Sequence, residues 1–126
     1  YMGIVGYGPK NVSDLFTNRQ ATTLATFSKL VQKTRSKVIE DVKTSGIFDD
    51  YEKKRKEIST TAYSDAISIY LSIAISKMAD RGSVVCAWDS TRDSMGHTFG
   101  RQAIPMTWDF AEANPFSKST GNFLNE

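Results

Sequence analysis

The side chains best suited to metal or nucleophilic chemistry are one histidine and one cysteine. His97 is the only histidine and Cys86 the only cysteine among the 126 residues. A structural zinc site uses four ligands, and these two side chains supply half of them, with Asp89 and Asp93 as the nearest further candidates. A catalytic histidine also needs a nucleophile and an orienting acid. We therefore predict no metal site, and we expect His97 to be a hydrogen-bonding loop residue.

A second candidate is Asn114-Pro115-Phe116, which is one proline short of Asn-Pro-Pro-Phe. Amino-group DNA methyltransferases use that four-residue motif to hold a flipped base: the side-chain oxygen and a proline carbonyl accept hydrogen bonds from the target amino group, and the ring stacks on the base. Here the missing proline shifts the ring by one position, and a predicted helix leads into the motif. The pattern favours a helix terminus over a base clamp. Trp108, Asn114 and Phe116 remain candidates for a pocket wall.

Basic side chains give the chain its candidates for nucleic-acid contact. The stretch EKKRKE is a short cluster of cations flanked by acids, which can contact phosphate groups or form an exposed polar helix face. Arg101-Gln102 can contact phosphates or base edges, but Arg101 can equally form a structural ion pair with Asp109 or Glu112. The candidate DNA-binding residues are Lys53, Lys54, Arg55, Arg92, Arg101 and Gln102.

Helices must position these residues. Thr17-Asn18-Arg19-Gln20 has the T-x-x-Q form of a capping box, and apolar residues at three-, four- and seven-residue steps follow it, so we predict a helix over 18–44 that ends at Gly46. Acids at 49–52 indicate a second helix start. The stretch TTAYSDAISIYLSIAISKMADRG predicts a central core helix that ends at Arg81-Gly82. Since Ile69 and Ile73 widen its apolar stripe, we expect it to be covered on more than one side.

The last third of the chain predicts shorter elements. SVVCAWD, residues 83–89, indicates a strand, and the polar residues after it indicate a turn. Pro105 fits the first turn of a third helix that runs to Ala113, where Asn114-Pro115 stops it. The sequence therefore predicts one mainly α domain over 1–126, with about three principal helices and one or two short extended segments.

Composition limits the function classes. The net charge of +2 is too small to argue for nucleic acid by itself, and no apolar run approaches the roughly 20 residues that span a bilayer. A single thiol suits a reducing, cytoplasmic setting. Tyr1 stands where an initiator methionine is expected, and GNFLNE closes no element, so we expect a piece of a longer protein.

Three stretches together resemble one family. GYGPKNVSDLFTNRQATTLATFSKLV, AYSDAISIYLSIAISKMADRGSVVCAWD and, most specifically, TFGRQAIPMTWDFAEANPFSKSTGN are similar to the interior of the large adenine-specific DNA methylases that contain an inserted zinc ribbon. In that family the cofactor-binding glycine motif and the zinc ribbon precede this region, and the Asp-Pro-Pro-Tyr catalytic motif follows it.

The resemblance implies a parent protein that methylates adenine N6 in DNA with S-adenosylmethionine. It implies that this chain is a helical segment without catalytic, cofactor-binding or metal residues of its own, and that it is inactive alone. We expect it to position DNA or to brace the remainder of the methyltransferase, and as an isolated fragment to form homo-oligomers. The alternative is a stand-alone helical interaction or scaffold module.

Overall fold

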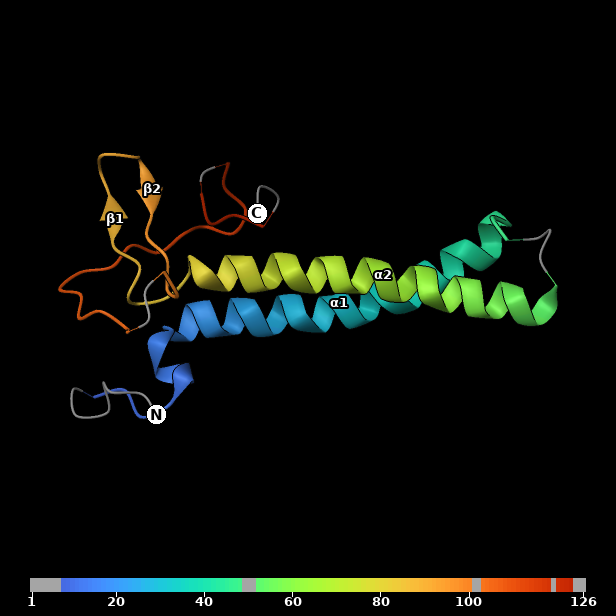
Figure 1. Cartoon of the computed structure of the whole chain (residues 1–126), viewed down its shortest axis with the longest axis horizontal. Helices are drawn as coiled ribbons and strands as arrows, with labels where there is room; N and C mark the ends of the chain where they lie inside the picture. The colour runs from blue at the N-terminus through green and yellow to red at the C-terminus, as the bar shows by residue number, and fades with distance from the viewer. Residues whose placement is uncertain (1–7, 49–51, 101–102, 119, 124–126) are drawn as a thin grey trace. The chain divides into compact units, whose positions relative to one another are not determined.

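The chain is mainly α, as predicted. The computed structural model describes residues 8–48, 52–100, 103–118 and 120–123. Two long helices dominate it (Figure 1). The elements in chain order are the 3-10 helix η2 (Val12–Leu15), α1 (Asn18–Ser45), α2 (Lys53–Asp80), β1 (Trp88–Asp89) and β2 (Ser94–Met95).

The chain divides into two compact units. Unit 1 comprises Tyr1–Ala25 and Ala74–Glu126, and unit 2 comprises Thr26–Ile73. Both long helices contribute residues to each unit. Unit 2 is therefore a pair of helical segments joined by a connection, whereas unit 1 combines helix ends with the hairpin and the irregular C-terminal segment.

Helix α1 begins and ends where the sequence predicts. The Thr17 amide donates to Gln20 Oε1 at 2.8 Å, and the Gln20 amide donates to Thr17 Oγ1 at 3.2 Å. This reciprocal pair is the predicted capping box, which satisfies two amides that the first turn of a helix leaves free. At the other end Gly46 adopts a φ of +68°, the left-handed conformation that ends many helices.

Helix α2 is one continuous element, so the predicted second helix start and the central core helix belong together. The acids at 49 and 50 lie outside the described residues. In unit 2 the helix buries Thr60 and Ser64, and Tyr63 meets the ring of Phe48 edge-on at 6.4 Å. The expectation of cover on a second side is wrong for the chain by itself, because Ile69 and Ile73 remain exposed.

After α2 the chain forms a small hairpin. The predicted strand over 83–89 is reduced to β1, which pairs antiparallel with β2. The residues before β1 turn instead, and the Cys86 amide donates to the Ser83 carbonyl at 3.2 Å. Asp93 holds a φ of +48° in the connection. Aspartate tolerates this left-handed conformation better than most residues, which suits a tight turn.

The predicted third helix over 105–113 does not form. The segment bonds to other parts of unit 1 instead: the Ala111 amide donates to the Cys86 carbonyl at 2.9 Å, and the Thr107 side-chain Oγ1 donates to the Val84 carbonyl at 3.2 Å. Thr, Trp, Asp and Phe at 107–110 have poor helix propensity. Because nothing local strongly favours a helix there, the tertiary hydrogen bonds decide, and the chain stays irregular.

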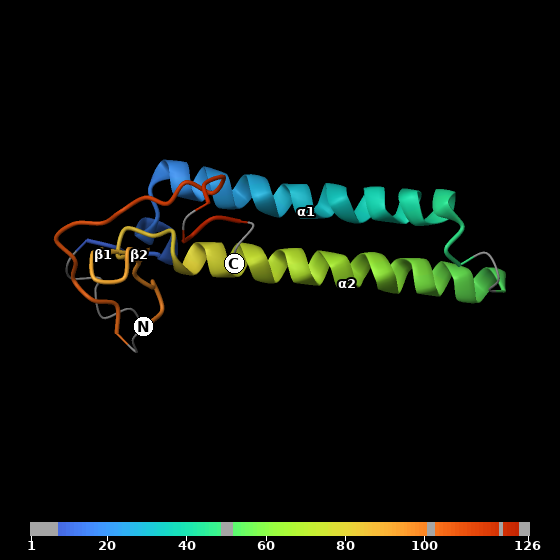
Figure 2. The same ribbon diagram turned by 90° about the horizontal axis from the view of Figure 1, so that it is seen from above.

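Unit 1 has a compact apolar core. Its buried apolar side chains are Leu15, Ile75, Met78, Cys86 and Met95. The Val84 amide donates to the Leu15 carbonyl at 2.8 Å, which ties η2 to the loop after α2. Figure 2 shows the segment after the hairpin returning to the start of α1 within this unit. The polar ends of both helices are thereby brought beside an irregular segment that is distant in sequence.

Candidate functional site

Unit 2 contains a groove with four cations among its eight lining residues, which we call the basic groove. It has a volume of about 690 Å³. Its lining residues are Arg35, Ile39, Lys43, Lys53, Lys56, Glu57, Thr60 and Thr61. Helix α1 supplies the first three at four-residue spacing, and α2 supplies the rest from its first three turns. Side chains four residues apart lie on one helix face, so each helix presents its cations to the same groove.

One of the predicted DNA-binding residues of α2 lies at this groove. Lys53, Lys54 and Arg55 form the exposed first turn of the helix, and Lys53 is in the groove lining whereas Lys54 and Arg55 are not. The candidate residues identified from the sequence do not include Arg35 and Lys43, which α1 contributes. Their eight-residue separation across Ile39 was the available signal, since it places both on one face.

Acidic groups balance part of this charge. Arg35 Nε lies 2.6 Å from Asp65 Oδ1, and both side chains are about half exposed. Glu57 is the acid in the lining. The Thr60 and Thr61 hydroxyls donate to the carbonyls of Lys56 and Glu57 within the helix. A hydroxyl that donates one bond can still accept another. The groove therefore combines several cations with hydroxyl oxygens, an arrangement suited to phosphate groups and the water around them.

Arg92, another predicted DNA contact, is not in this groove. Arg92 belongs to unit 1, where it is exposed in the hairpin turn with its Nε 3.8 Å from Asp89 Oδ2. Arg101 and Gln102 lie outside the described residues. The predicted set thus has Lys53, Lys54 and Arg55 in one unit and Arg92 in the other.

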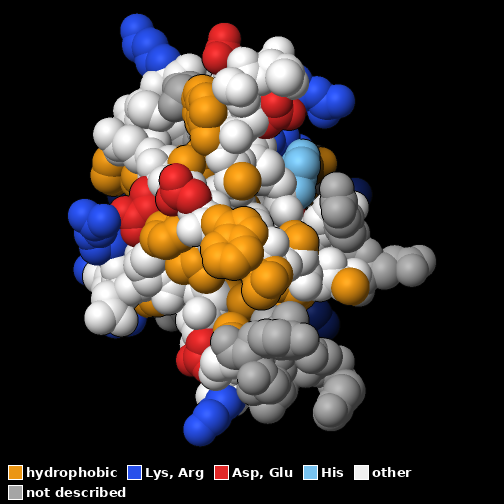
Figure 3. All heavy atoms as spheres, turned by 90° about the vertical axis from the view of Figure 1, so that its left-hand side faces the viewer, with side chains coloured by type: hydrophobic (Ala, Val, Ile, Leu, Met, Phe, Trp, Pro, Cys, Tyr) orange, Lys and Arg blue, Asp and Glu red, His pale blue; other side chains and the backbone are white. Residues whose placement is uncertain are grey.

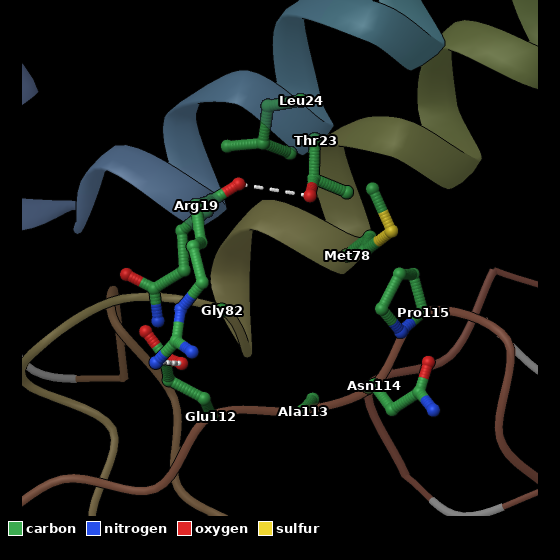
Figure 4. Close-up of a pocket in the computed structure, with 11 residues that line it drawn as sticks. Arg19, Thr23, Leu24, Met78, Gly82, Glu112, Ala113, Asn114 and Pro115 are labelled. Atoms are coloured by element: carbon green, nitrogen blue, oxygen red, sulfur yellow. Dashed lines mark hydrogen bonds and ion pairs between the residues drawn. The ribbon is translucent and has the colours of Figure 1, made fainter.

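Unit 1 has a cavity of its own, with a volume of about 370 Å³ (Figure 4). The start of α1, the end of α2 and the segment around Ala113 line it. Glu112 joins two of these elements, because its carboxylate accepts a hydrogen bond from Thr17 Oγ1 at 2.8 Å and pairs with Arg19 Nη2. The sequence also suggested Arg101 as a partner for Glu112, and Arg101 lies outside the described residues.

The walls of this cavity are of two kinds. Leu24, Met78 and Pro115 supply apolar surface, and Arg19 and Glu112 supply the charged edge, as Figure 4 shows. Gln20 Nε2 is buried and has no hydrogen-bond partner among the described residues. A buried amide without an acceptor is costly, and a small molecule or water with an acceptor atom would satisfy it. Among the residues that the structure describes, the lining includes no histidine, cysteine or serine that could act as a nucleophile or base.

Asn114-Pro115-Phe116 forms a turn, so the prediction of a helix terminus is wrong. Asn114 Oδ1 accepts a hydrogen bond from the Phe116 amide at 3.0 Å, and its carbonyl accepts one from the Ser117 amide at 3.1 Å. Asparagine favours such turns because its side chain can replace a backbone acceptor. The Pro115 carbonyl in turn accepts from the Phe123 amide at 3.0 Å. Both acceptors that a base clamp would offer are therefore bonded to the chain's own backbone.

The predicted pocket-wall residues do not share one cavity. Asn114 borders the cavity of Figure 4, whereas Trp108 borders an apolar groove of about 570 Å³ with Met106 and Phe110. Trp108 is 95% exposed and Phe116 81% exposed. Figure 3 looks onto unit 1 and shows hydrophobic side chains gathered in the middle of this face.

Cys86 and His97 both bond to the end of α2. Cys86 is fully buried, with Sγ 3.4 Å from Ser83 Oγ and 3.3 Å from Thr98 Oγ1. His97 Nδ1 lies 2.6 Å from Asp80 Oδ2, which confirms the hydrogen-bonding role predicted for it. Across the described ranges, no group of three histidine, cysteine, aspartate or glutamate side chains is placed to hold a metal ion.

The Asp80 carboxylate holds this end of unit 1 together. It also accepts a hydrogen bond from the Phe99 amide at 2.9 Å. Partial burial raises its pKa, but the hydrogen bonds from His97 and Phe99 outweigh this, so the pKa of Asp80 is lowered from its usual 3.8. The carboxylate is thus charged near neutral pH and acts as an anchor for the loop that follows β2.

Within the part of the chain that the structure describes, neither long helix has an apolar stretch sufficient to cross a membrane. Comparisons with protein-family models, with curated proteins and with solved structures give no match to this chain.

Proposed function

We propose that this chain is a non-catalytic helical segment of an S-adenosylmethionine-dependent DNA adenine-N6 methyltransferase, and that it helps to position DNA. The methyltransferase part of the proposal is supported by the resemblance of residues 98–122 and of the two earlier stretches to the zinc-ribbon-containing adenine-specific methylases. The observation that carries the DNA part is the convergence of Arg35, Lys43, Lys53 and Lys56 on one groove.

The charge of the chain is distributed in a way that suits this role. Unit 2 contains nine Lys and Arg against seven Asp and Glu, so it carries the whole net charge of +2. A DNA backbone attracts such a surface without regard to sequence, because each neutralised phosphate releases a bound counterion. The basic groove would then hold the backbone, while base recognition and methyl transfer belong to other parts of the parent protein. No residue of this chain is assigned to bind S-adenosylmethionine.

Salt-dependent binding of duplex DNA tests the proposal. The variant Lys43→Ala/Lys53→Ala/Lys56→Ala removes three cations of the groove lining. We expect it to bind more weakly than the original chain. We also expect the slope of log K against log salt concentration to fall by about 2 to 3, because each phosphate that is no longer neutralised reduces it by about 0.9. Fluorescence anisotropy over a range of salt concentrations measures both quantities.

A matched control separates the groove from general charge. Lys29→Ala/Lys33→Ala/Lys37→Ala removes the same three charges from exposed positions of α1 outside the groove lining. This control should change the slope by less than one. Equal losses in both variants would contradict a role for the groove, and no binding at low salt would contradict DNA positioning altogether.

The second candidate function is a helical interaction or scaffold module. The exposed apolar side chains of α2, including Ile58, Ile69 and Tyr70, favour it, since contiguous exposed apolar surface usually marks a contact with another protein. The reading frame after Glu126 distinguishes the two functions. An Asp-Pro-Pro-Tyr motif soon after this residue supports the methyltransferase, and its absence there would leave the interaction module.

A further inference from the structure

Helix α2 carries in unit 2 a stripe of apolar residues that is exposed along its whole length. We call this set the apolar stripe, and its members are Ile58, Ala62, Ala66, Ile69 and Ile73. Steps of four, four, three and four residues place all of them on one helix face. We propose that this face is a dimer interface that packs against the same face of a second copy of the chain.

The exposed apolar area is large enough for a dimer. Ile58, Ile69 and Ile73 are 61%, 60% and 49% exposed, and the neighbouring Tyr63 and Tyr70 are 47% and 75% exposed. With about 200 Å² for a large side chain, these five residues offer roughly 600 Å² per copy. Two copies would bury roughly 1,200 Å², which reaches the lower end of the range for specific interfaces. A single exposed isoleucine would need no explanation, but this set does.

The order of residues along the stripe is self-complementary when two copies run antiparallel. With the two-fold axis between positions 65 and 66, Ile58 lies opposite Ile73 of the second copy, and Ala62 lies opposite Ile69. Large side chains then fill the spaces above small ones, as in ordinary helix packing. On the edge of the stripe Tyr63 approaches Tyr70 of the second copy. The interface is isologous, as expected for a two-fold dimer.

Charges beside the stripe are compatible with this arrangement. Asp65 lies next to the proposed axis, so two aspartates would approach each other. Each one is already paired with Arg35 of its own chain at 2.6 Å, and this ion pair reduces the repulsion. The groove residues Lys53 and Thr60 lie on the opposite face of α2 by helical spacing, whereas Lys56 lies beside Tyr63 at the edge of the interface. The dimer would therefore leave most of each basic groove open, and it does not depend on DNA binding.

Self-association of the 126-residue chain tests the interface. Sedimentation equilibrium from low to high micromolar concentration should give a reversible monomer–dimer equilibrium for the unchanged chain. Ile69→Lys should raise the dimer dissociation constant on the order of 100-fold, because it places two charges in an apolar contact. The matched control is Ile47→Lys, which changes an isoleucine of the same 60% exposure outside the stripe; its dissociation constant should stay within about twofold of the original.

Disulfide trapping tests the register. In the antiparallel arrangement Ala66 lies next to its own symmetry mate, so Ala66→Cys should form an intermolecular disulfide under mild oxidation. Ala62 is displaced from its mate by about 10 Å along the axis, given the rise per residue of a helix, so Ala62→Cys should not. The buried Cys86 gives the background in the unchanged chain. A monomer at every concentration would overturn the interface, and equal trapping at both positions would overturn the antiparallel register.

Discussion

Unit 1 and unit 2 are stabilised in different ways. In unit 2 the side-chain hydrogen bonds are mostly local, such as those from Thr60 and Thr61 to carbonyls four residues earlier in α2. In unit 1 they join distant residues, such as Thr17 to Glu112 across 95 positions and Thr98 to Ser83 across 15. A helix satisfies its own backbone, whereas an irregular segment must find its partners elsewhere. Long-range polar contacts are therefore the structural basis of unit 1.

The two units also differ in how completely they bury their apolar side chains. Unit 1 buries Leu15, Met78, Cys86 and Met95 almost completely. Among the described residues of unit 2, Val42 is the one large hydrophobic side chain that is buried to a similar degree, and several isoleucines of α2 are exposed. Unit 1 should therefore be sensitive to small changes in shape, while unit 2 should tolerate most single substitutions and respond to partners instead.

The strongest test of this contrast is Gly121→Ala in unit 1. Gly121 has a φ of +84°, and an added Cβ would lie 2.8 Å from the Ala113 Cβ. Backbone strain and overlap together should cost about 3 kcal/mol of unfolding free energy, measured by guanidinium denaturation.

Two further variants separate strain from overlap. Gly8→Ala should lose only about 1 kcal/mol, because Gly8 has a φ of +124° but no atom within 4 Å of the added Cβ. Adding Ala113→Gly to Gly121→Ala should recover part of the loss. A loss equal to that of Gly8→Ala would show that the contact with Ala113 is unimportant.

A matched pair of threonines compares the two kinds of hydrogen bond. Thr98 is buried in unit 1, where its hydroxyl donates to Ser83 Oγ at 2.8 Å. Thr98→Val keeps the shape but leaves buried polar atoms without a partner, so it should lose about 2 kcal/mol. Thr61→Val in unit 2 removes a hydroxyl that bonds only within its own helix, and it should change stability by less than about 0.5 kcal/mol. Equal losses, measured by thermal denaturation, would contradict the proposed difference.

The pH dependence gives the smallest effect. Asp80 has a folded pKa below its usual 3.8. Its contribution is therefore present above that pH and is lost as pH falls through the folded value. Asp80→Asn should cost about 1 kcal/mol near neutral pH, because the loss of charged hydrogen bonds is partly offset by removal of a negative charge at a helix C-terminus.

The difference between the original chain and Asp80→Asn should shrink as the solution is acidified below pH 3.8, which denaturation at a series of pH values would measure. The control is Asp65→Asn, which removes the half-exposed ion pair with Arg35 in unit 2. It should cost less than about 0.5 kcal/mol. A difference for Asp80→Asn that is unchanged at low pH would show that its charge is not the stabilising feature.

The sequence predicted elements well where local rules decide. The capping box at Thr17 and Gln20 and the glycine at 46 marked both ends of α1 within about one residue, because each rule involves only neighbouring atoms. The apolar period of α2 was equally clear. The helix over 105–113 was predicted wrongly, since Pro105 and a short apolar period are weak signals, and the bonds to Val84 and Cys86 involve residues about twenty positions away.

The candidate site can likewise be divided into features that local sequence predicts and features that depend on long-range contacts. Sequence identified Lys53 as part of a cationic cluster, but it did not connect Arg35 and Lys43 to this residue, because only the packing of α1 beside α2 in unit 2 brings the three cations to one groove. It also could not show that Asn114 Oδ1 and the Pro115 carbonyl are both bonded to the chain's own backbone.

Local sequence thus determined the two long helices, their ends and the exposed cations, because helix formation depends on side chains within four residues of each other. Tertiary structure alone decided the path of residues 103–118 and 120–123, the partners of Glu112 and Asp80, and the basic groove. Those features depend on which hydrogen-bond donors and acceptors, distant in sequence, come within bonding distance once the helices have formed. No periodicity in the sequence predicts such pairs. Among them is the turn at Asn114, which is held by the Phe116 and Ser117 amides rather than by the end of a helix.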